Sequence, residues 1–174
     1  ALKGQEEFLQ AAALIARRLP NTYFIIAGID SSRGQQIRQS LERLKDELGL
    51  RDRVCFLDWL EDVAVLHCAL DVFVSASRSE SFGLAIAEAM ASQTAVVTTM
   101  TEGARELIDA GRTGLLVPIG DAEAIAESVV SLLTDQAKRE QLASTAAETV
   151  RIRFGLNRMI DATEAIYREV LGKE

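Results

Sequence analysis

Apolar residues recur along this chain with two spacings, one typical of amphipathic helices and one typical of buried strands. Apolar positions three or four residues apart mark the segments 6–19, 37–48, 63–69, 121–133, 138–151 and 157–171. Short continuous apolar runs, rich in β-branched residues, lie between them at 22–27, 53–57, 72–75, 95–98 and 114–117. Residues that cap or stop helices stand at the borders, among them Pro20, Ser31 or Ser32, Gly49 and Asp121. The pattern predicts strands and helices that alternate along nearly the whole chain.

Strands that are apolar throughout, rather than at every second position, are typical of a sheet that is covered on both faces. Such sheets are mostly parallel, because the connections between their strands are helices that lie on the two faces. We therefore expect an α/β fold of the doubly wound, Rossmann-like kind. With 174 residues, the chain is long enough for one sizeable core and too short for two ordinary domains, so residues 1–174 are expected to form a single domain.

Composition and charge exclude some classes of function for this chain. A net charge of −7 argues against a broad surface for nucleic acid, so no nucleic-acid partner is expected. No apolar run approaches the length of a membrane span and the start shows no signal-peptide pattern; membrane contact by a longer protein is left open. Cys55 and Cys68 lie in apolar segments without metal-ligand spacing, so they are expected to be reduced core thiols in a cytoplasmic protein.

The stretch from Ser79 to Met90 carries the most informative chemistry. A strand enters it, and a helix of small and apolar residues that contains one carboxylate, Glu88, leaves it. A carboxylate in so apolar a helix is expected to be buried and therefore to need a partner. In a parallel α/β sheet, ligands bind at the carboxyl ends of the strands. The loops after Gly28 and Leu57 and the loops 75–83 and 98–103 are accordingly expected to share one crevice.

The helix start within this stretch is suited to phosphate. Backbone N–H groups from Ser81 to Leu84 have no partner inside the helix, and such groups bind anions. Glu88 lies roughly 8 Å further along the helix axis, at ~1.5 Å per residue. A carboxylate beside phosphate is expected to accept hydrogen bonds from hydroxyl groups, and Glu80 and Glu88 would do so on either side. A phosphate with hydroxyls on both sides describes a nucleotide sugar.

The same residues resemble a known family. The chain is similar, over nearly its whole length, to the carboxyl-terminal, donor-binding domain of retaining GT-B glycosyltransferases of the glycosyl transferase group 1 type. The resemblance rests on Lys3-Gly4, on the strand runs that end at Gly28 and Leu57, on Thr113 to Val117, and above all on two glutamates eight positions apart joined by Phe-Gly-Leu.

This resemblance implies a function and a set of site residues. A nucleotide-diphospho-sugar, UDP- or GDP-linked, would be the donor, and the full-length enzyme would transfer the sugar with retention and without a metal or other cofactor. Glu80 would be catalytic, in contact with the transferred sugar, and Glu88 would hold the ribose hydroxyls. Lys3 would neutralise the leaving diphosphate and Leu57 would lie beside the base. The other substrate-binding residues implied are Gly28, Ser81, Phe82, Gly83 and Leu84.

The chain also departs from the family pattern. In the family a strand ending in Gly-Arg precedes the Lys-Gly pair, and an amino-terminal domain supplies the acceptor site; neither is in this sequence. The fragment is therefore expected to be inactive by itself. Its final helix, 157–171, is expected to pack on the missing domain, and the open sheet edge or that helix offers surfaces for self-association. Glu102-Gly103 stands where paired glycines are common.

Plainer interpretations stay open beside this one. Glu80 and Ser81 are also typical of an ordinary helix start, and Lys3 of a solvated surface. His67, the only histidine, lies in an apolar segment and favours a structural role. A non-catalytic module that binds nucleotide, phosphosugar or another protein is the alternative function. A phosphoacceptor domain would use Asp30 or Asp58, but no other feature supports it.

Overall fold

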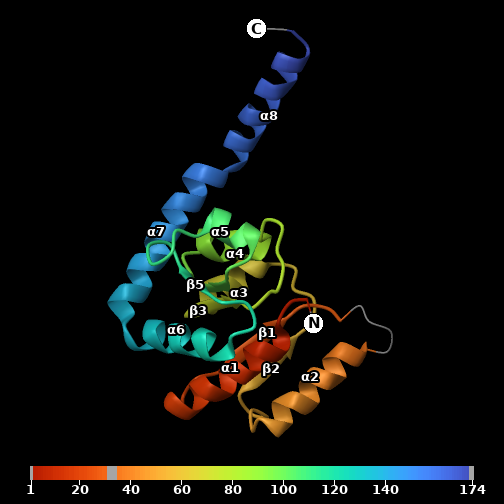
Figure 1. Cartoon of the computed structure of the whole chain (residues 1–174), viewed down its shortest axis with the longest axis vertical. Helices are drawn as coiled ribbons and strands as arrows, with labels where there is room; N and C mark the ends of the chain where they lie inside the picture. Colours follow the sequence, from red (N-terminus) through yellow and green to blue (C-terminus); the bar gives the residue numbers. More distant parts are fainter. Residues whose placement is uncertain (1, 31–34, 173–174) are drawn as a thin grey trace.

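The computed structural model describes residues 2–30 and 35–172, in which helices and strands alternate as the sequence predicts (Figure 1). The strands are β1 (Phe24–Ala27), β2 (Val54–Leu57), β3 (Val72–Ser75), β4 (Ala95–Thr99) and β5 (Leu115–Val117). The helices are α1 (Gln5–Arg18), α2 (Gln36–Glu47), α3 (Val63–Ala69), α4 (Leu84–Ala91), α5 (Glu102–Leu107), α6 (Ala122–Thr134), α7 (Gln136–Phe154) and α8 (Leu156–Val170).

All strand pairing is parallel, but the strands form two sheets instead of one. β1 pairs with β2, and β3, β4 and β5 pair in that order. Within the described residues, β1 and β3 each pair on one side only. A cavity of about 1080 Å³ lies between them and is lined by the residues of both strands. This cavity therefore separates the β1–β2 sheet from the β3–β4–β5 sheet. The strand that the family pattern places before Lys3-Gly4 stays a prediction.

Some polar atoms around this cavity have no hydrogen-bond partner among the described residues. Gln5 Oε1 and both ring nitrogens of His67 are buried without a hydrogen-bond partner among the described residues, and both side chains line the cavity. Buried polar atoms are nearly always paired in folded proteins.

Helices cover both faces of the strands, which confirms the doubly wound architecture. Alternate residues of β4 point to opposite layers, as they must in a strand. Ala95 and Val97 pack in the cluster formed mainly by α1 and α6, whereas Val96 packs in the cluster of α4, α5 and α7. β4 is buried along its whole length, because it alone has strand neighbours on both sides.

Several expectations from sequence are wrong in detail. Cys55 and Cys68 are exposed rather than core residues: Cys55 lies on the outer strand β2 and Cys68 on the outward face of α3. Ile37, expected in the apolar stripe of α2, is 43% exposed. Helix α5, for which no helix was predicted, begins after Thr101, whose side chain accepts the N–H of Ala104. The predicted cap at Ser31 or Ser32 lies outside the described residues.

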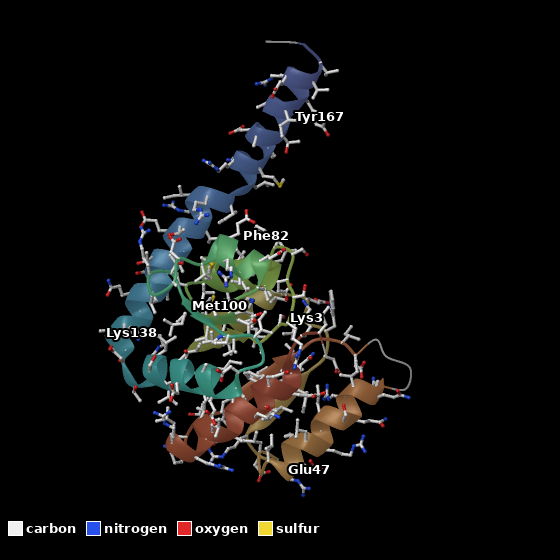
Figure 2. The ribbon with its side chains drawn as sticks, in the orientation of Figure 1. Lys3, Glu47, Phe82, Met100, Lys138 and Tyr167 are labelled. Carbon is white, nitrogen blue, oxygen red and sulfur yellow. The ribbon has the colours of Figure 1, made fainter. Side chains whose placement is uncertain are left out.

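Helix α8 follows the body of the molecule through α7 and extends away from it (Figure 1). None of its residues is buried, although its apolar side chains recur with helical spacing. Tyr167, 64% exposed, stands on this projecting part (Figure 2). The predicted helix is confirmed; its docking on another domain stays a prediction. No helix within residues 2–30 and 35–172 is both long and apolar enough to cross a bilayer.

Candidate functional site

Three of the predicted site residues meet at the carboxyl ends of β1 and β3. Lys3, Gly28 and Glu80 line the same cavity, and Lys3 lies beside the start of α1 (Figure 2). Leu57 is adjacent to them, because the N–H of Gly28 donates to the carbonyl of Leu57 at 3.0 Å. The remaining predicted residues lie on the loop after Glu80 and on α4. These residues follow Glu80 along the chain but do not line the cavity, so the predicted site extends beyond the cavity.

Glu80 is the most constrained carboxylate in the site. Its Oε1 accepts hydrogen bonds from Lys3 Nζ at 2.7 Å and from Ser77 Oγ at 2.8 Å, and its side chain is 18% exposed. Burial raises the pKa of Glu80, but the bonds from Lys3 and Ser77 and the charge of Lys3 outweigh it and hold the pKa below its ordinary value. Lys3 is therefore a partner of Glu80 and not simply a solvated lysine. Ser77 was not predicted from sequence.

The loop that carries Glu80 is fixed from three directions. The N–H of Arg78 donates to the carbonyl of Leu2 at 2.9 Å, which ties the loop to the start of the chain. Thr99, at the end of β4, donates its hydroxyl to the carbonyl of Ser77. On the third side, the N–H of Gly103 in α5 donates to the carbonyl of Glu80 at 3.0 Å. The position of Glu80 is thus set by contacts far apart in sequence.

Gly103 permits the close approach of α5 to this loop. A Cβ at this position would lie 2.6 Å from the carbonyl carbon and oxygen of Phe82. Because backbone atoms cannot give way by such an amount, α5 can only lie against the loop with glycine here. The Phe82 ring points away from the site and packs edge-on against Phe154, with ring centroids 5.6 Å apart. Phe82 therefore offers its backbone, not its ring, to a ligand.

The start of α4 presents unpaired backbone donors. Gly83 has a left-handed conformation with φ 92°, which places the following N–H groups at the helix tip. Within the described residues, no acceptor is found for the N–H groups from Ser81 to Leu84. Such a helix tip is a suitable site for an anion, through these N–H groups and the positive end of the helix dipole.

Glu88 is exposed, which corrects the expectation that it is buried. The buried positions of α4 are Ile86, Ala89 and Met90, whereas Leu84 and Glu88, one turn apart, share the opposite face. The carboxylate of Glu88 makes no ion pair or hydrogen bond within the described part of the chain. Its charge acts on His67, but no hydrogen bond or ion pair among the described residues holds the carboxylate in place, so it is accessible to a ligand.

The other titratable residues singled out from the sequence lie outside the group formed by Lys3, Ser77 and Glu80. The backbone N–H of Arg38 donates to Asp30 at 2.8 Å, and its guanidinium lies 3.3 Å from Asp58. These aspartates are bound to one arginine on α2, which does not support a phosphoacceptor site. His67 is buried and packs edge-on against Phe73, with ring centroids 5.1 Å apart. Burial lowers the pKa of His67, and the negative charge of Glu88 acts on this pKa in the opposite direction.

Among residues 2–30 and 35–172, no three His, Cys, Asp or Glu side chains are grouped as metal ligands.

We expect the stability of the fold to fall as the pH drops below about 4.5. Burial raises the pKa of Glu7 and Glu80, but hydrogen bonds hold both below the ordinary value of 4.5. The unfolded chain therefore binds more protons than the folded chain as pH falls from 4.5 toward the folded-state pKa values, so the free energy of unfolding decreases. Urea unfolding between pH 3 and 7 measures this change. The Glu7→Gln variant is expected to show a shallower pH dependence; an unchanged slope would contradict the assignment for Glu7.

Comparison with known proteins identifies the family of this chain. The family described as "Glycosyl transferases group 1" matches residues 1–149. Lipopolysaccharide core biosynthesis glycosyltransferase LpsE of Rhizobium meliloti is 35% identical over 160 residues, which are 92% of this chain and 44% of LpsE. The chain thus spans less than half the length of this relative.

Solved structures show the same fold. The C-terminal domain of the glycosyl transferase group 1 family protein LpcC from Francisella tularensis superimposes with a TM-score of 0.82, at 28% identity, over 89% of this chain and 81% of that domain. HepE from Anabaena, in complex with UDP-glucose, has a TM-score of 0.87 at 30% identity, over 94% of this chain and 45% of HepE. With a family match over most of its length and the fold of the C-terminal domain of a GT-B glycosyltransferase, the chain belongs to the glycosyl transferases group 1 family.

Proposed function

We propose that this domain binds a nucleotide-diphospho-sugar and that the longer protein transfers the sugar to an acceptor with retention of configuration. The observation that carries the proposal is the arrangement of the unpaired helix tip of α4 between two carboxylates, Glu80 and Glu88. Support also comes from HepE, which is described in complex with UDP, with UDP-glucose, and with UDP and glucose.

Each residue has a separate task in this proposal. The diphosphate binds the N–H groups from Ser81 to Leu84, and the hydroxyls of the ribose donate to Glu88. Glu80 accepts from hydroxyls of the transferred sugar, beside the carbon that reacts. Gly28 and Leu57 border the base, where the absence of a side chain at Gly28 leaves room for close approach.

Lys3 changes partner as the donor reacts. Without a donor it pairs with Glu80 at 2.7 Å. The departing diphosphate carries more negative charge than one carboxylate, so the ammonium group of Lys3 moves to it as the bond to the sugar breaks. An ammonium group placed where charge develops stabilises the transition state. The same movement releases Glu80 toward the sugar.

Turnover by the longer protein tests the proposal. We expect donor hydrolysis or transfer with at least one common UDP- or GDP-linked sugar, and we expect none from residues 1–174 alone, since the acceptor side of the cleft is absent. Product analysis by NMR reports the configuration at the transferred carbon. If the longer protein binds nucleotide but turns over none of these donors, the non-catalytic binding module is the correct function. Cytoplasmic location, self-association and the domain that α8 contacts stay predictions.

A further inference from the structure

A second ion pair lies beneath the loop that carries Glu80. Arg78 Nη2 donates to Glu7 Oε1, and Glu7 is 8% exposed. Glu7 lies in the first turn of α1, where the helix dipole favours a carboxylate. A buried carboxylate is stable only when it is paired, so this contact satisfies Glu7. Neighbouring Glu6, in contrast, is exposed and forms no ion pair within the described residues.

Arg78 is held to the start of the chain through both its backbone and its side chain. Its N–H donates to Leu2 and its guanidinium to Glu7. The same short segment brings Lys3 to Glu80, so residues 2–7 contact the loop at three points. Gly4 adds a fourth constraint, because a Cβ there would lie 1.9 Å from the carbonyl oxygen of Ala76. Since residues 76–83 form no helix or strand, these contacts, together with those of Thr99 and Gly103, hold the loop in its conformation.

The charge of Arg78 gives this pair a consequence beyond stability. Arg78 is two residues from Glu80, and its side chain is 54% exposed. If its guanidinium were not engaged by Glu7, it would be a mobile cation close to Glu80, and an arginine binds a carboxylate more firmly than a lysine does. It would then compete with Lys3 for Glu80 and draw that carboxylate away from the sugar.

We infer that Glu7 is a positioning residue of the donor site: by engaging Arg78 it fixes the loop and reserves Glu80 for Lys3 and the sugar. This inference rests on the proposed function, in which Glu80 contacts the transferred sugar and Glu88 the ribose. A defect at Glu7 should therefore affect recognition of the sugar and leave recognition of the nucleotide largely intact.

Calorimetric titration of the chain with two pairs of ligands tests the inference: UDP with UDP-glucose, and GDP with GDP-mannose. In Glu7→Gln we expect affinity for the nucleotide sugar to fall about tenfold and affinity for the nucleotide alone to change less than about twofold. Glu6→Gln, one residue away on the exposed side of α1, is the matched control and should change neither. Glu7→Asp, which keeps the carboxylate, should recover part of the loss.

A double variant separates positioning from stability. Glu7→Gln with Arg78→Gln removes the competing cation along with its partner, so sugar recognition should partly recover although the ion pair is gone. Equal losses for nucleotide and nucleotide sugar, together with a lower unfolding midpoint and no recovery in the double variant, would show that the pair contributes stability only.

One measurement needs no ligand. The amide signal of Gly103, whose N–H donates to Glu80, should shift in the NMR spectrum of Glu7→Gln and stay in place in Glu6→Gln. If it does not move in Glu7→Gln, the inference is overturned whatever the ligand data show. If the wild-type chain binds none of the four ligands but the Gly103 signal moves, the coupling between Glu7 and the Glu80 loop holds and the proposed function fails.

Discussion

Glu88→Ala is expected to weaken binding of UDP or GDP to this domain at least about tenfold while leaving the fold intact. A carboxylate that accepts hydrogen bonds from hydroxyls contributes about 1.5–3 kcal/mol, which is a factor of ten or more in affinity. Glu88 is exposed on α4 and has no ion pair or hydrogen bond in the described part of the chain. Alanine favours helices, so the free energy of unfolding should change by less than about 0.5 kcal/mol.

Calorimetric titration and urea unfolding measure the two parts of this prediction separately. Glu106→Ala is a matched control, because Glu106 is also an exposed helical glutamate, on α5, and it should change neither quantity. If Glu88→Ala keeps the wild-type affinity for UDP and GDP, Glu88 does not bind the ribose hydroxyls. Loss of affinity together with a large loss of stability would show that Glu88 supports the fold instead.

In the longer protein, the amides of Ile25 and Ala27 are expected to exchange with solvent at least about a hundredfold more slowly than in residues 1–174. The N–H groups of Phe24 and Gly28 donate to β2, at 2.8 and 3.0 Å. Residues alternate along a strand, so Ile25 and Ala27 direct their N–H groups toward the cavity beside β3. A parallel strand from the residues before Ala1 would pair with them there.

The position of the chain start supports this prediction. Lys3 and Gln5 line the cavity, and α1 leads from them back to β1, which is the path of a strand–helix–strand crossover. Ile26, whose N–H faces β2, is the internal control and should be protected in both forms. Rapid exchange of Ile25 and Ala27 in the longer protein would contradict the prediction. If amide exchange of Ile25 and Ala27 in residues 1–174 becomes slower as the protein concentration rises, two copies of the chain pair at this strand.

Local patterns were enough to predict most of the elements. Every β strand and all helices but α5 lie where apolar spacing and caps place them, and Asp121 caps α6 by accepting the N–H of Ala124 at 2.9 Å. Helix α5 is only six residues long and contains Gly103, which disfavours helices. It forms because Ala104 and Leu107 are fully buried against the α4 layer, and a local pattern does not report such packing.

Part of the candidate site could likewise be predicted from the sequence, and part could not. The glutamate pair around Phe-Gly-Leu, with Lys3 near the chain start, was visible in the sequence, because each motif is contiguous. Ser77 and Arg78 were not recognised as site residues. Ser77, which donates to Glu80 three positions on, belongs to no motif used in the sequence analysis, and the partner of Arg78, Glu7, is 71 positions away. The burial of Glu88 was predicted wrongly because the composition of α4 does not say which face is turned outward.

The sequence by itself determined the order of strands and helices, the doubly wound class and the family, because these follow from apolar spacing and from contiguous motifs. Only the tertiary structure decided that the strands form two sheets with a cavity between β1 and β3 and that Lys3 binds Glu80. It also decided that Glu88 is exposed and that Glu7 engages Arg78. The physical reason is that ion pairs, burial and missing strand partners depend on distances between residues far apart in the chain, which arise only when the layers pack together.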